Sequence, residues 1–150
     1  MLFRSEWVDV SPDLVAIVTI ARRVHDDTGG GFDITAGAGR VGNMRGVVVR
    51  ASPPALKKTA AGLRIDLGGI GPGYAVDSIG ARLCELGSQS HLVELGGEVR
   101  AWGERAADGG WRVAVRGTGK IVELRAGEAL ATSTARPGRS PVDQIGRAHV

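Results

Sequence analysis

The sequence predicts an α+β fold with mostly antiparallel strands flanked by helices. Two stretches carry apolar residues at helical spacing, and the second half of the chain contains several short strand patterns separated by glycine turns. The 150 residues are 43% hydrophobic, which is enough for one domain with one core, but only 4% are aromatic. We therefore expect a core built mainly from Val, Ile, Leu and Ala.

The first expected helix begins after Ser11, a residue type that caps helix N-termini well. Pro12 suits the first helical position, and Asp13 interacts favourably with the helix dipole. Apolar residues then recur on one face until about Thr28, where a run of three glycines predicts the end of the helix. The glycine-rich stretch at 36–45 has no period and predicts a loop, followed by a short strand at 47–49.

The most informative segment is a turn at 66–75 that contains four glycines. We expect a strand at 63–67 before it and a helix from about Tyr74 after it. Glycines let a backbone approach a phosphate closely, and free N–H groups there bind anions. Asp66 adds a carboxylate beside this turn, so the segment predicts a site for a nucleotide diphosphate with a cation nearby. A purely structural turn is the alternative.

Two common phosphate-binding motifs are absent from this turn. The third glycine of the dinucleotide-binding fingerprint is replaced by Tyr74, and no Lys-Ser or Lys-Thr pair follows the glycines as in a Walker motif. The turn therefore matches neither motif, and the alternative of a purely structural turn stays open.

The helix after the turn is expected to bury one apolar stripe and to end near Gly87. Cys84 is the single cysteine, so it cannot form an internal disulfide, and its apolar neighbours predict an inert core thiol. The expected stripe consists of Val76, Ile79, Leu83 and Leu86.

The second half of the chain predicts an antiparallel meander. Short strand patterns lie at 92–95, 99–102, 111–115 and 121–124, and a further strand is expected at 129–133. We expect residues 1–143 to form the domain. Residues 144–150 match one reading frame of a widely used sequencing adapter, so we expect a non-native tail in which His149 has no function.

Charge and hydropathy argue against a nucleic-acid interface and against a membrane-spanning segment in this chain. The net charge is +3, but the basic residues are scattered and have no aromatic residues between them, so we expect no nucleic-acid interface. No apolar run is long enough to span a membrane, and the first residues lack the layout of a signal peptide. His25 and His91 have no partner at metal-ligand spacing. Asp33, taken alone, reads as a capping or turn aspartate.

Five ordered segments together resemble the FAD:protein FMN transferase family, over about residues 12–133. The segments are Gly31-Phe32-Asp33-Ile34-Thr35, then 66–77, then Leu92-Val93-Glu94-Leu95-Gly96-Gly97-Glu98-Val99, then Gly110-Trp111-Arg112-Val113, and finally Leu130-Ala131-Thr132-Ser133. The resemblance implies a flavin transferase that binds FAD and Mg²⁺. Such an enzyme passes FMN to a Thr or Ser hydroxyl of a target protein and releases AMP.

The resemblance also assigns residues, although it assigns no catalytic residue. It implies that FAD contacts Gly31, Phe32, Asp33 and Asp66, and that the position of Gly69 contributes to the metal site. Gly69 has no side chain, so only its carbonyl could bind the cation. Pro72 stands where the family usually has Lys or Glu in contact with the flavin nucleotide, so a polar contact is lost there.

Other family features have no counterpart in these residues. The segment ahead of the first helix that helps to hold the flavin, a His-x-x-Asp-Pro-x-Thr-Gly segment and later Asp and Thr metal ligands are missing. We therefore expect an incomplete flavin transferase domain, truncated at both ends and inactive alone. The alternatives are an FAD diphosphatase that releases FMN and AMP, or a nucleotide-binding module without catalysis. The family includes lipoproteins outside the cytoplasmic membrane as well as cytoplasmic members.

Overall fold

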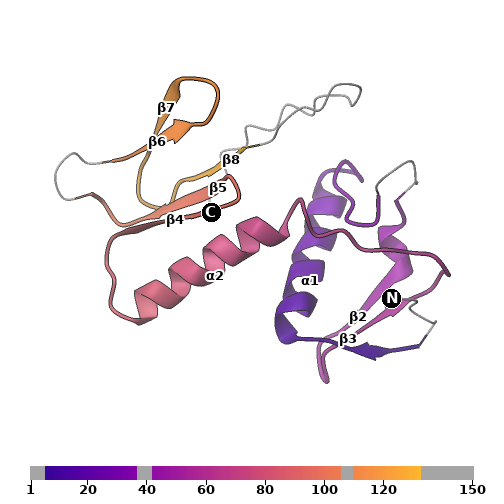
Figure 1. The fold of residues 1–150 in the computed structure, drawn as a ribbon. Coiled ribbons are helices and arrows are strands. Elements are labelled where there is room, and N and C mark those ends of the chain that lie inside the picture. Colours follow the sequence, from indigo (N-terminus) through magenta and orange to yellow (C-terminus); the bar gives the residue numbers. More distant parts are fainter. Residues whose placement is uncertain (1–5, 37–41, 106–109, 133–150) are drawn as a thin grey trace. The chain divides into compact units, whose positions relative to one another are not determined.

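The computed structural model describes residues 6–36, 42–105 and 110–132 (Figure 1). They form two α-helices and three small antiparallel sheets, which confirms the predicted α+β class. The chain divides into two compact units, Met1–Gly71 (unit 1) and Pro72–Val150 (unit 2). The expected tail at 144–150 and Ser133 lie outside the described residues. None of the described helices is long and apolar enough to cross a membrane.

The predicted first helix forms in unit 1. α1 (Pro12–Asp27) follows β1 (Val8–Asp9), and the Ser11 hydroxyl accepts a hydrogen bond from the Leu14 N–H at 3.2 Å, so the predicted N-cap is confirmed. Within the expected loop at 36–45, a short 3₁₀ helix, η1 (Met44–Gly46), forms before β2 (Val47–Arg50). The strand predicted at 47–49 is thus confirmed, with one more residue.

The sheet of unit 1 contains two strands that the sequence does not predict, the two-residue β1 and β3 (Ala55–Lys58). β3 pairs antiparallel with both β1 and β2, giving the order β1-β3-β2. Lys58 is only 7% exposed, and its ammonium group donates to the Leu63 carbonyl. A lysine that buries its stem at an inward position interrupts the apolar alternation by which strands are recognised.

The prediction of a strand at 63–67 is wrong. These residues are extended but belong to no ladder, and the Asp66 N–H donates to the Ile34 carbonyl at 2.7 Å. Leu63, Ile65 and Leu67 still alternate inward onto the core of unit 1. One-sided burial of an extended segment gives the same sequence pattern as a strand, whether or not a partner strand exists. The buried members of this core are Val18, Ala21, Ile34, Met44, Val47 and Leu56.

The described residues of unit 2 form one helix and five strands. α2 (Gly71–Glu85) begins three residues earlier than predicted, at the boundary between the units. β5 (Glu98–Trp102) pairs antiparallel with β4 (His91–Leu95) and with β8 (Ala129–Ala131). β6 (Trp111–Val115) and β7 (Lys120–Leu124) form a separate hairpin, so the strands are confirmed but the single meander is wrong.

α2 buries only part of the predicted stripe. Val76 is buried as predicted and Leu83 is half-buried, whereas Ile79 is 44% and Leu86 is 67% exposed. Gly80, which the pattern does not include, is also buried. A Cβ on Gly80 would lie 2.1 Å from the Trp102 ring, so the helix presents this backbone position to the sheet. The predicted core position of Cys84 is also wrong, because its side chain is exposed.

The predicted end of α2 is confirmed. Gly87 has φ +91° and donates to the Cys84 carbonyl at 2.9 Å, while the Ser88 N–H donates to the Leu83 carbonyl at 3.0 Å. These two bonds form a Schellman motif, which favours glycine at the left-handed position.

Candidate functional site

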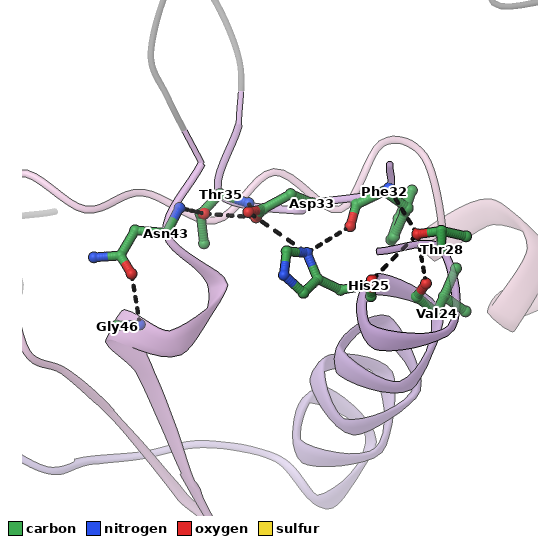
Figure 2. Close-up of polar contacts among 8 residues, drawn as sticks. All are labelled: Val24, His25, Thr28, Phe32, Asp33, Thr35, Asn43 and Gly46. Carbon is green, nitrogen blue, oxygen red and sulfur yellow. Dashed lines mark hydrogen bonds and ion pairs between the residues drawn. The ribbon is translucent and has the colours of Figure 1, made fainter. Parts of the chain in front are cut away.

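The Gly31-Phe32-Asp33 segment is tied to the end of α1 by Thr28. The Thr28 hydroxyl donates to the Val24 carbonyl at 2.7 Å and accepts from the Phe32 N–H at 3.1 Å (Figure 2). Gly29 and Gly30 have φ values of +59° and +88°, and they turn the chain back after the helix. The predicted FAD-contacting segment therefore follows a fixed helix end.

Asp33 is held inside unit 1. One carboxylate oxygen accepts from the Thr35 N–H at 2.7 Å and from the Thr35 hydroxyl at 2.6 Å. The Thr35 hydroxyl accepts from the Asn43 N–H at 2.6 Å, and the Asn43 amide oxygen accepts from the Gly46 N–H at 3.1 Å (Figure 2). The Asp33 side chain is only 8% exposed. It therefore acts as a turn aspartate that links the segments on both sides of residues 37–41.

His25 joins this network, a role that the sequence does not reveal. Its Nδ1 lies 2.8 Å from the Phe32 carbonyl and 3.7 Å from the second carboxylate oxygen of Asp33. Since a carbonyl only accepts, Nδ1 carries the hydrogen. A Cβ on Gly42 would lie 2.2 Å from that same carboxylate oxygen, so Asp33 leaves room only for glycine. His25 lies in α1 and Asp33 lies in the turn after it, so no sequence motif predicts that the two side chains meet.

The glycine turn is more self-contained than predicted. The Asp66 carboxylate accepts from the Gly68 N–H at 2.8 Å, and the Leu67 carbonyl accepts from the N–H groups of Ile70 and Gly71 at 3.0 and 2.6 Å. Three N–H groups of the turn are thus used internally, which corrects the expectation that they are free for a phosphate. Asp66 itself is exposed.

Unit 1 brings two of the predicted segments together. The Asp66 N–H donates to the carbonyl of Ile34, next to Asp33, and a Cβ on Gly69 would lie 3.2 Å from the Phe32 ring. The exposed Asp66 carboxylate and the half-buried Phe32 ring therefore belong to adjacent segments. Pro72 lies in unit 2, at the second residue of α2, and is half-buried.

The described residues do not fit a complete magnesium site. Among them, no group of three or more His, Cys, Asp or Glu side chains could hold a metal ion. Gly69 offers only its carbonyl, whereas Mg²⁺ requires near-octahedral oxygen ligands.

A hollow of about 300 Å³ opens beside α1 and β2 in unit 1. It shares no residue with the predicted FAD contacts. It is lined by Arg22, His25, Asp26, Met44, Arg45, Val47 and Val48.

Comparison with known proteins decides the family. The model of the ApbE family matches residues 38–137. The chain belongs to the ApbE family. The resemblance drawn from the five sequence segments is thereby confirmed.

Relatives and solved structures agree with this assignment. The chain is similar to an FAD:protein FMN transferase of Haemophilus influenzae (25% identity, 72% of this chain and 39% of that protein). It is also similar to one of Chlamydia muridarum (27% identity, 85% and 47%). Among solved structures, the apo form of Pseudomonas stutzeri flavinyl transferase ApbE matches with a TM-score of 0.73 and 27% identity, covering 89% of this chain and 51% of that one.

A second solved structure, the ApbE protein of Thermotoga maritima, matches with a TM-score of 0.71 and 25% identity, covering 97% of this chain and 56% of that one. The chain spans less than half of the length of the two curated relatives above. It therefore represents part of the ApbE fold.

Proposed function

We propose that the chain forms the FAD-binding part of an FAD:protein FMN transferase. The observation that carries this proposal is the family match over residues 38–137, which includes the glycine turn. Unit 1 supports it, because the Phe32 and Asp66 segments are adjacent there. The activity itself belongs to a protein of full family length.

The side chains at this place suit different parts of a dinucleotide. Asp66 is exposed and uses one oxygen for the Gly68 N–H, so its other oxygen can accept from a ribose hydroxyl or an amino group. The Phe32 ring offers a flat apolar surface to a flavin or adenine ring. Asp33 is buried and bonded, so we assign it the task of holding Phe32 and Gly31 in place.

The proposed reaction is transfer of FMN from FAD to a protein. A Thr or Ser hydroxyl oxygen of the target attacks the FMN phosphorus and forms a new P–O bond. The bond between that phosphorus and the bridging oxygen breaks, AMP leaves with the electron pair, and the hydroxyl proton is released. The family resemblance implies Mg²⁺ as well, with the Gly69 carbonyl as one ligand, but the described residues supply no further ligand set. If water attacks instead, the products are free FMN and AMP.

FAD titration of the chain tests the binding part of the proposal. We expect Asp66→Asn to weaken FAD binding measured by the change in flavin fluorescence, since a carboxylate acceptor is replaced by an amide. Asp9→Asn is the matched control, because the Asp9 carboxylate on β1 is also exposed and pairs with Arg50. Equal FAD affinities in the wild type and both variants would refute the assignment of Asp66.

Pro72 is another expected FAD contact and provides a separate test of FAD binding. We expect Pro72→Lys to tighten FAD binding by roughly fivefold, the equivalent of one polar contact of about 1 kcal/mol. Pro12→Lys, at the first residue of α1, controls for the added charge at a helix start. Equal tightening by both variants would show a general effect of added charge and would mean that Pro72 does not contact FAD.

A further inference from the structure

An ion pair joins α2 to the sheet of unit 2. Arg100 Nη1 donates to the Asp77 carboxylate at 2.8 Å, across 23 positions of the sequence. The Arg100 side chain is 20% exposed and the Asp77 side chain 54%. The arginine end is thus shielded from water, which makes the pair stronger than one between two fully solvated side chains.

Trp102 holds the same helix at a second point. A Cβ on Gly80 would lie 2.1 Å from its ring, so the helix backbone rests directly on the indole. The His91 ring stacks on the Trp102 ring, with ring centres 5.0 Å apart, and its Nε2 lies 3.2 Å from the Gly80 carbonyl. The Arg100 guanidinium lies 5.2 Å from the Trp102 ring centre, within cation–π range.

Burial of the Arg100 side chain lowers the stability that this position contributes to the fold. Its Nε is buried and has no hydrogen-bond partner among the described residues. A well-packed apolar residue avoids that desolvation penalty, whereas an ion pair of defined direction fixes one helix orientation. The arrangement therefore suits accurate placement of α2 better than maximum stability.

The helix segment that this pair fixes carries Pro72. Asp77 follows Pro72 by five residues, or about one and a half helical turns, so the two move as one rigid piece. We propose that Asp77 and Arg100 are positioning residues for FAD: with the Gly80–Trp102 contact, they hold the first turn of α2, and hence Pro72, at a fixed place on the sheet of unit 2. This inference rests on the proposed function, which makes Pro72 a contact of FAD.

The experiment compares Asp77→Asn and Arg100→Gln with Glu85→Gln in the full 150-residue chain. Glu85 pairs with Arg82 at 2.6 Å on the same helix, and both side chains are exposed. The readouts are FAD affinity and amide hydrogen exchange at residues 73–78. We expect Asp77→Asn and Arg100→Gln each to weaken FAD binding and to speed this exchange by about fivefold. Glu85→Gln should change neither.

Two further results make the outcome decisive. Arg100→Lys keeps the charge, so it should recover part of the affinity and protection that Arg100→Gln loses. If the exchange at 73–78 is the same in Asp77→Asn and in the wild type, the positioning role is refuted, whatever FAD does. If the wild type binds no FAD but the exchange differs as expected, the hold on α2 stands and the proposed function fails.

Discussion

Asp33 and Asp66 are both expected FAD contacts, yet their carboxylates lie in opposite surroundings. Asp33 is 8% exposed and accepts two hydrogen bonds from Thr35, whereas Asp66 is exposed and accepts one from Gly68. A buried bonded carboxylate stabilises the fold, while an exposed one with a spare oxygen is available to a ligand. The two aspartates therefore differ in burial and bonding, although the sequence predicts the same role for both.

The first prediction follows from this difference. Asp33→Ala leaves the Thr35 N–H and hydroxyl without their acceptor, so it should lower the free energy of unfolding by about 2 to 3 kcal/mol. Asp66→Ala should lower it by less than about 1 kcal/mol, as surface substitutions do. Urea unfolding of both variants measures the difference. Equal losses would mean that Asp66 is a fold residue as well.

Glu98, at the start of β5, provides a prediction about pH. Burial raises the pKa of its carboxyl above 4.5. The folded state therefore binds more protons than the unfolded state above pH 4.5, and stability falls as the pH rises through the folded pKa. We expect Glu98→Gln to be more stable than the wild type at pH 7 and to lose that advantage below pH 4.5. Urea midpoints at both pH values measure this, and an advantage that is constant with pH would contradict it.

At the scale of elements, the sequence predicts those helices and strands whose signals lie within the element or directly beside it. α1 has its cap, its proline and its closing glycines in sequence, and α2 has Gly87 at its C-terminal end, so both helices could be predicted. The strands of unit 2 alternate clearly and were also predictable. β3 and the extended segment at 63–67 were not, because Lys58 is buried in the first and the second lacks a partner strand.

The face that α2 buries depends on a contact between distant residues. Apolar periodicity alone selects Ile79, but the approach of Gly80 to Trp102 turns the helix so that Ile79 is 44% exposed. A glycine that permits close packing carries no hydrophobic signal, so sequence patterns do not reveal it.

Substituting this glycine tests the packing of α2. Gly80→Ala places a methyl group within 2.1 to 2.5 Å of three Trp102 ring atoms, so it should destabilise unit 2 by about 1 to 3 kcal/mol. Gly73→Ala, on the same helix, meets no atom within 4 Å and should be neutral or stabilising by up to about 1 kcal/mol. Thermal or urea unfolding measures both. A neutral Gly80→Ala would show that α2 does not rest on Trp102.

At the scale of the whole molecule, the family could be predicted but the site only in part. Five weak segments in a fixed order point to the same family that the match over 38–137 shows. Two of these segments, those of Phe32 and Asp66, are adjacent in unit 1. The roles of His25, Thr28 and Asn43 were not predictable, because their hydrogen bonds depend on how the turns fold back on α1.

The central claim is that these residues belong to an enzyme that moves FMN from FAD to a protein. The most direct measurement is mass spectrometry of a threonine-bearing target peptide incubated with FAD, Mg²⁺ and a full-length protein that contains this chain. We predict a mass increase equal to FMN on the peptide, with AMP as the second product, and a loss of both when Mg²⁺ is omitted. Free FMN and AMP with an unmodified peptide would contradict transfer and establish an FAD diphosphatase instead.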